Sequence, residues 1–167
     1  MEKKLYTLIV HSENIAGILN QVTTIFTRRQ LNIESLNVSA SSIKGIHKYT
    51  ITTCTDEETI IKVTKQIEKR IDVVKANYFT DEQIIFREIA LYKIPTAELL
   101  ASNRIESIIS QHNARILEVN ETYTVLQKSG TSEETAALYY DLAEIKISQF
   151  VRSGRVAITK SHSEKLS

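Results

Sequence analysis

The sequence predicts an α+β protein made of two tandem βαββαβ units, the ferredoxin-like arrangement in which helices cover one face of an antiparallel sheet. Short apolar or alternating segments take turns with segments of helical spacing, and this order occurs twice along the 167 residues. Glycines and helix-capping residues fall between these segments. We place the first unit at residues 1–80, the second at 81–160, and a polar tail at 161–167.

The first unit begins with the apolar strand "LYTLIV" at 5–10, and helical spacing follows from Ile15. Strands are predicted at 31–41 and 47–55, and Gly45 allows the tight turn of a hairpin between them. Asp56 is expected to cap a second helix, because a short carboxylate can accept hydrogen bonds from the first helical turn. A fourth strand at 71–79 completes the unit.

The second unit repeats this order. A strand at 84–94 ends at Pro95, and residues 97–112 have the spacing of a helix. The segments 114–119 and 123–130 form a hairpin-like pair. Thr131 or Ser132 is expected to cap a helix over 133–143. The stretch "ISQFVRSGRVAIT" at 147–159 is predicted to be the final strand, broken near Gly154.

The composition excludes several function classes. The chain has 21 Lys and Arg against 20 Asp and Glu, a net charge of +1, so there is no strong electrostatic case for binding nucleic acid or an anionic membrane. No apolar run is as long as a membrane span. The single cysteine, Cys54, allows no internal disulfide and is expected to be buried. We therefore expect a cytoplasmic protein.

Sequence motifs of catalysis and metal binding are missing. The chain has no Walker loop, GxGxxG, HExxH or GxSxG motif, and its four histidines lack metal-ligand spacing. The loop after the first strand carries no arginine that could clamp a phosphate. We therefore predict no catalytic residue, no metal site and no cofactor of the chain's own.

The segment "HSENIAGILNQV" at 11–22 places Gly17 and Asn14 at the entrance of the first helix. One interpretation is structural: Asn14 or Ser12 caps the helix and Gly17 relieves packing. The other is binding of an amino acid, because first-turn N–H groups suit a carboxylate and glycine permits a close approach. Asn14 would then add a polar contact, and the apolar wall would consist of Ile15, Ile18 and Leu19. The residues alone favour the structural interpretation.

A family resemblance shifts this balance. The stretch "NIAGILNQVTTIFTRRQLNIESLNV" at 14–38 resembles the regulatory small subunit of acetolactate synthase. Its specific parts are the "N-x-x-G-x-L" loop and "NIESL" at 32–36. Similarity continues in order through "REIALYKI" at 87–94, "TYTVLQKSGT" at 122–131 and "VRSGRVAI" at 151–158, so it covers nearly the whole chain.

This resemblance implies an N-terminal ACT domain that binds an amino acid at a dimer interface, followed by a C-terminal ferredoxin-like domain. It implies a homodimer that activates a large catalytic subunit and confers feedback inhibition by a branched-chain amino acid, valine before leucine or isoleucine. Thiamine diphosphate, Mg²⁺ and FAD would belong to that partner, which forms acetolactate from two pyruvates. The effector residues implied by the motifs are Asn14, Ile15, Ala16, Gly17, Ile18 and Leu19 of one protomer, with Asn32 and Ile33 of its neighbour.

Two other function classes compete with this one. A free-standing ACT-type amino-acid sensor could control another protein or transcription, but the sequence has no helix-turn-helix or ribbon-helix-helix segment. A small ferredoxin-like enzyme is disfavoured by the missing phosphate clamp.

Overall fold

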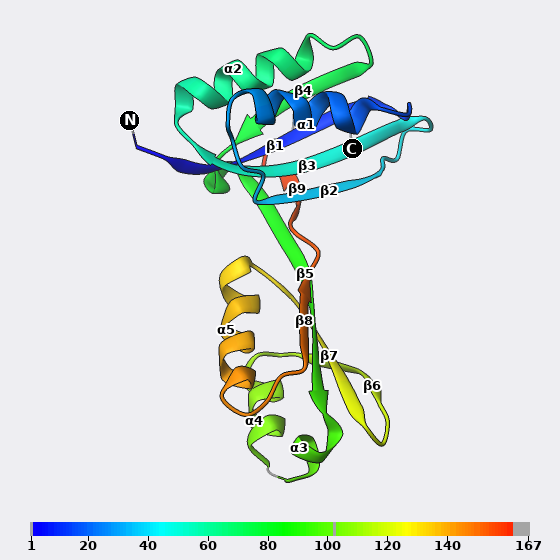
Figure 1. Ribbon diagram of the computed structural model, residues 1–167, viewed down its shortest axis with the longest axis vertical. Coiled ribbons are helices and arrows are strands. Elements are labelled where there is room, and N and C mark those ends of the chain that lie inside the picture. Colours follow the sequence, from blue (N-terminus) through cyan, green and yellow to red (C-terminus); the bar gives the residue numbers. More distant parts are fainter. Residues whose placement is uncertain (1, 102, 162–167) are drawn as a thin grey trace. The chain divides into compact units, whose positions relative to one another are not determined.

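The computed structural model describes residues 2–101 and 103–161 and divides the chain into two compact units (Figure 1). The first unit contains the residues up to Phe86 together with those from Arg155 onward, and the second contains Arg87–Gly154. The division into domains at 1–80 and 81–160 stays a prediction, and the compact units differ from it at both ends. Of the predicted polar tail, 162–167 lie outside the described residues.

The first unit is a four-stranded antiparallel sheet with two helices on one face. The strand order is β2-β3-β1-β4, so β2 and β4 form its edges. Its elements are β1 (Lys4–Glu13), α1 (Ile18–Arg28), β2 (Ser35–Ala40), β3 (Ile46–Thr55), α2 (Glu57–Glu68), β4 (Val73–Phe79), the single 3-10 turn η1 (Asp81–Gln83) and, from the end of the chain, β9 (Val156–Thr159).

The core of this unit follows from the two sequence periods. Alternate residues of β1 face the helices, and every third or fourth residue of each helix faces the sheet. The side chains of Leu8, Val22, Phe26, Ile51 and Ile60 are among those fully buried there. Asp56 caps α2 as predicted, because its carboxylate accepts a hydrogen bond from the Thr59 N–H at 2.9 Å.

The second face of β1 is also buried, which explains why that strand is a nearly continuous apolar run. Ile9 points away from the helices and packs with Ile84 and Ala157, with Phe79 and Phe86 at the margin of this small cluster. Its cover therefore includes chain that returns to this unit about 150 residues after β1.

The second unit repeats the topology. Its sheet has the order β6-β7-β5-β8, which matches the order of the first unit strand for strand, and β9 also pairs with β5. The elements are β5 (Ile84–Pro95), α3 (Thr96–Ala101), α4 (Asn103–Gln111), β6 (Arg115–Val119), β7 (Tyr123–Gly130), α5 (Ser132–Ala143) and β8 (Gln149–Arg152). The predicted fold class, two βαββαβ units of α+β type, is confirmed.

The core of the second unit lies between this sheet and α4 and α5. A buried carboxylate, Glu88, ties the elements together: it accepts hydrogen bonds from the Thr135 hydroxyl at 2.5 Å and from Arg152 Nε at 2.7 Å. Tyr92 is also fully buried and donates its hydroxyl to the Thr135 carbonyl at 2.6 Å. Burial, with the nearby Glu88 charge, raises the Tyr92 pKa.

Several predicted boundaries shift. The first helix begins at Ile18 rather than Ile15, and the second strand begins at Ser35 rather than at residue 31. The helix predicted over 97–112 corresponds to α3 and α4, and residue 102 between them lies outside the described residues. The final strand is broken as predicted, but its second half, β9, belongs to the first unit. Thr131, not Ser132, caps α5.

Candidate functional site

The entrance of α1 is formed by backbone rather than by a capping side chain. Gly17 is the N-cap residue, with φ 92° and ψ −11°, and its carbonyl accepts the first helical hydrogen bond from the Gln21 N–H at 3.0 Å. No side chain in the described part of the chain caps this helix, and the Ser12 hydroxyl donates to the neighbouring Glu13 carbonyl instead. The interpretation that Asn14 or Ser12 caps α1 is therefore wrong.

The packing explanation for Gly17 is also wrong. A Cβ built on Gly17 would meet no described atom within 4 Å, so the glycine does not relieve a close contact. Its positive φ requires it, because side chains other than glycine seldom adopt that region. The space in front of the residue is open, as an approaching ligand needs.

The loop before Gly17 is held in place by the β2–β3 turn. The Asn14 N–H donates to the Gly45 carbonyl at 2.9 Å, and the Ile15 N–H donates to the Glu13 carbonyl at 3.0 Å. Asn14, Ile15 and Ala16 are exposed. The loop thus presents a short amide and an apolar side chain to solvent from a fixed backbone.

The two apolar residues that open α1 have different surroundings. Ile18 is 1% exposed and belongs to the core, so its side chain faces the sheet. Leu19 is 43% exposed, close to the 47% of Ile15. Of the predicted apolar wall, Ile15 and Leu19 are therefore the side chains available to a ligand.

The positive end of the α1 dipole is not balanced by its own side chains. The first turn of α1 contains no acidic residue. By contrast, α2 has Asp56 as its cap with Glu57 and Glu58 next to it, and α5 has Thr131 as its cap and two glutamates in its first turn. The Ile18 N–H donates to the Ile15 carbonyl at 3.4 Å. An external carboxylate would complement the remaining N–H groups of the first turn and the dipole at α1.

The other predicted site residues lie beyond the far end of α1. Asn32 is exposed, and its carbonyl accepts a hydrogen bond from the Thr53 hydroxyl at 2.7 Å. Ile33 is half-buried against the core. Since the 11 residues of α1 span about 16 Å, one chain does not bring this pair together with the loop at Asn14.

Asn32 lines a hollow of about 470 Å³ between the end of α1 and the start of α2. Lys3 and Arg29 also line it, together with Glu34. From the sequence, Arg29 could be placed near the end of the first helix but not in a hollow. No local sequence signal indicated that Lys3 lies there. Cys54 lies in this hollow too and is exposed, so the expectation that it is buried was wrong.

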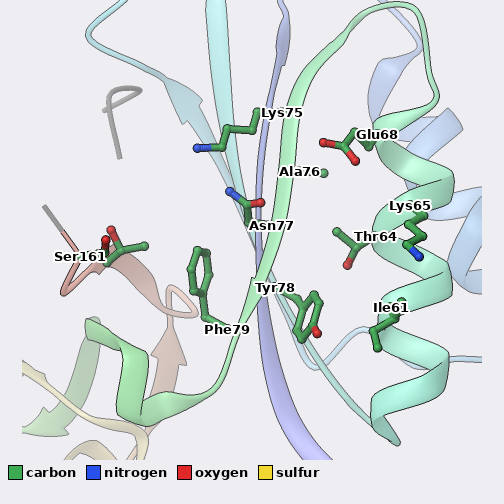
Figure 2. A pocket seen from close by; sticks show the side chains of 11 residues that line it. Ile61, Thr64, Lys65, Glu68, Lys75, Ala76, Asn77, Tyr78, Phe79 and Ser161 are labelled. Atoms are coloured by element: carbon green, nitrogen blue, oxygen red, sulfur yellow. The ribbon is translucent and has the colours of Figure 1, made fainter. Parts of the chain in front are cut away.

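A second hollow, of about 520 Å³, surrounds the edge strand β4 (Figure 2). On one side, Tyr78 faces Ile61 and Thr64 of α2, and on the other Phe79 lies near Ser161. None of the predicted site residues is among the residues that line it, and we assign it no part in effector binding.

Among residues 2–101 and 103–161, no group of three or more His, Cys, Asp or Glu side chains could hold a metal ion. None of the helices that the structure describes is long and apolar enough to cross a membrane.

Comparison with known proteins matches both halves of the chain. The family described as "AHAS small subunit-like ACT domain" matches residues 8–75, and "Small subunit of acetolactate synthase" matches residues 87–161. The acetolactate synthase small subunit of Bacillus subtilis is 32% identical over 99% of this chain and 95% of its own length. That of Aquifex aeolicus is 30% identical over 99% of this chain and 85% of its own.

A solved structure has the same fold. The acetolactate synthase small subunit from Thermotoga maritima superimposes with a TM-score of 0.86 and 24% sequence identity. The match covers 95% of this chain and 99% of the other, so it includes both βαββαβ units.

Proposed function

Because the chain belongs to the acetolactate synthase small-subunit family, we propose that it is a regulatory subunit that activates the large catalytic subunit and makes it sensitive to valine. The observation that carries this proposal is similarity across nearly the whole chain, with both parts of the effector motif in order. In this proposal the small subunit has no catalytic role. Thiamine diphosphate, Mg²⁺ and FAD belong to the partner, and both subunits act in the cytoplasm.

Valine fits the chemistry of the α1 entrance. Its carboxylate would accept hydrogen bonds from first-turn N–H groups at Gly17, where no Cβ stands in the way. The side-chain oxygen of Asn14 would accept from the ammonium group. The exposed Ile15 and Leu19 would contact the isopropyl group, and leucine or isoleucine would present a similar apolar surface.

A second protomer would complete this site. β2 begins two residues after Ile33, and its far end leads into the turn whose Gly45 carbonyl accepts a hydrogen bond from the Asn14 N–H. If the edge strand β2 pairs antiparallel with β2 of a second copy, the start of each strand lies beside the end of the other. Asn32 and Ile33 of one protomer would then face the Asn14–Gly17 loop of its partner. We therefore propose a homodimer joined along β2.

Reconstitution tests the function. The purified chain, incubated with pyruvate, thiamine diphosphate and Mg²⁺, is expected to form no acetolactate. Adding it to the large subunit from the same source should raise the rate above that of the large subunit alone, and valine should lower the rate only when both are present. Acetolactate formation by the small chain alone, or an unchanged rate in the mixture, contradicts the proposal. Leucine and isoleucine in parallel titrations identify the effector.

A further inference from the structure

The motif "VRSGRVAI" at 151–158 contains the point where the chain returns from the second unit to the first. The first unit ends at Phe86 and resumes at Arg155. Only Ser153 and Gly154 separate Arg155 from Arg152, the residue that pairs with buried Glu88 in the second unit. The backbone just before Arg155 is fixed to β5, because the Ser153 N–H donates to the Ile89 carbonyl at 2.9 Å.

Arg155 is a buried cation whose partners lie on β1, on η1 and at the start of β5, all of them residues of the first unit. The residue is 5% exposed. Its Nη1 donates to an Asp81 carboxylate oxygen at 2.6 Å and to the Thr7 hydroxyl at 3.3 Å, and its guanidinium carbon lies 3.9 Å from the centre of the Phe86 ring. A buried guanidinium is tolerated only with such partners, and its planar fork fixes their directions.

One of these partners, Thr7, lies on β1, the strand whose far end leads to the proposed effector loop, Asn14–Gly17. Thr7 contacts Arg155, and Ile9, two residues later, packs with Ile84 and Ala157. Ile84 lies just before the chain enters the second unit, and Ala157 just after it has left. β1 therefore contacts both segments that connect to Arg87–Gly154.

We propose that Arg155 is a positioning residue for feedback: it couples β1, and with it the effector loop, to the chain segment that joins the second unit. This inference rests on the proposed function. It predicts that valine binding and the response to valine are separable, because Thr7, the residue of β1 that Arg155 contacts, lies seven positions before Asn14 in the chain.

The test uses the reconstituted complex with the large subunit and four small-subunit variants: Arg155→Met, Arg155→Lys, Asp81→Asn and the exposed control Arg28→Met. For each we measure valine binding by calorimetry, activation without valine, inhibition at saturating valine, and the melting temperature. Arg155→Met should bind valine within about threefold of wild type and still activate, but its coupling between valine and activity should fall about fivefold or more. Arg155→Lys keeps the charge and should lose less.

Asp81→Asn leaves Arg155 in place and removes its charged partner, so it should weaken inhibition in the same direction even if Arg155→Met fails to fold. Arg28→Met should behave as wild type. Full inhibition by valine in both Arg155→Met and Asp81→Asn overturns the inference, as does a parallel loss of binding, activation and stability, which is the mark of a purely structural role. If wild type binds no valine or is not inhibited by it, the proposed function fails and this inference fails with it.

Discussion

At the scale of single residues, the backbone conformation of position 17 explains why that residue is glycine. With φ at 92° and an open space where a Cβ would lie, the residue is glycine because of conformation and not because of crowding. Any substitution there adds strain of about 1–2 kcal/mol, so a loss of valine response in a single Gly17 variant would be ambiguous. Two substitutions at position 17 that add similar backbone strain must therefore be compared with each other.

Gly17→Asp and Gly17→Asn form such a pair, since both side chains tolerate the left-handed region and differ mainly in charge. Beside a bound carboxylate about 4 Å away, the aspartate should cost about 4 kcal/mol at an effective dielectric of about 20, more than a hundredfold in affinity. The asparagine should bind valine much better than the aspartate, with a similar melting temperature. Calorimetric titration of valine measures both.

Asn14→Ala in the same series should cost about 1–3 kcal/mol of binding, because it removes one polar partner. If Gly17→Asp binds valine as tightly as Gly17→Asn does, the effector carboxylate lies elsewhere.

Asp56 offers a test that depends on pH. The Thr59 N–H, and then the Thr59 hydroxyl, hold the pKa of this carboxyl below its usual value. A depressed pKa in the folded state means that its stabilising effect is present above the unfolded pKa of about 3.9 and is lost as the pH falls through the folded value. Asp56→Ala should therefore melt below wild type at pH 7, and the difference should shrink toward pH 2. A constant difference in melting temperature across that range would argue against the cap as its source.

At the scale of elements, the proposed dimer forms through β2, which is an edge strand of the first sheet. Edge strands present backbone groups that another strand can bind. Val38, near the middle of β2, is 38% exposed and is paired with Tyr49 of β3. In an antiparallel pair of β2 strands related by a twofold axis, the two copies of a central residue lie close to each other.

Val38→Glu should therefore weaken the dimer. Two like charges about 5 Å apart at an effective dielectric of about 20 repel by about 3 kcal/mol, which is roughly a hundredfold in the dimer dissociation constant. Val38→Thr keeps the branched shape without charge and serves as the control. Sedimentation equilibrium at micromolar concentration measures the shift. A Val38→Glu chain that stays as dimeric as Val38→Thr would place the interface away from β2.

At the scale of the whole molecule, the first unit depends on chain that follows the second. Ala157 covers Ile9, and Arg155 pairs with Asp81. The returning segment continues to Lys160, whose N–H donates to the Gln83 carbonyl at 3.0 Å. The first unit is thus complete only when residues from both ends of the chain are present.

A pair of truncations tests this dependence. A chain that stops after Gly154 loses these contacts, and one that stops after Ser161 keeps them, while both retain all of the second unit. Uncovering one isoleucine costs about 2 kcal/mol, so the shorter chain should unfold at a clearly lower urea concentration. Equal midpoints for the two truncations would show that the return segment adds little stability.

The sequence by itself determined the order of the elements, the repeated topology, the cap at Asp56 and the family, and it narrowed the cap of α5 to Thr131 or Ser132. These features are written in local signals: periods of two and 3.6 residues, a capping oxygen before a helix, and motif strings in order. The sequence also showed Asn14 and Asn32 as the first residues of the two motifs that carry the family resemblance.

Only the tertiary structure showed why residue 17 is glycine and that Cys54 is exposed. It also showed that Asn32 lies far from the Asn14–Gly17 loop of the same chain, and that Arg155 is buried in the first unit. The contacts of Arg155 with Thr7 and Asp81 join residues 148 and 74 positions apart. Such contacts leave no periodic trace, because they are set by which surfaces meet after the sheets have formed. A positive φ likewise follows from how the loop is held against the turn at Gly45, and glycine permits it without specifying it.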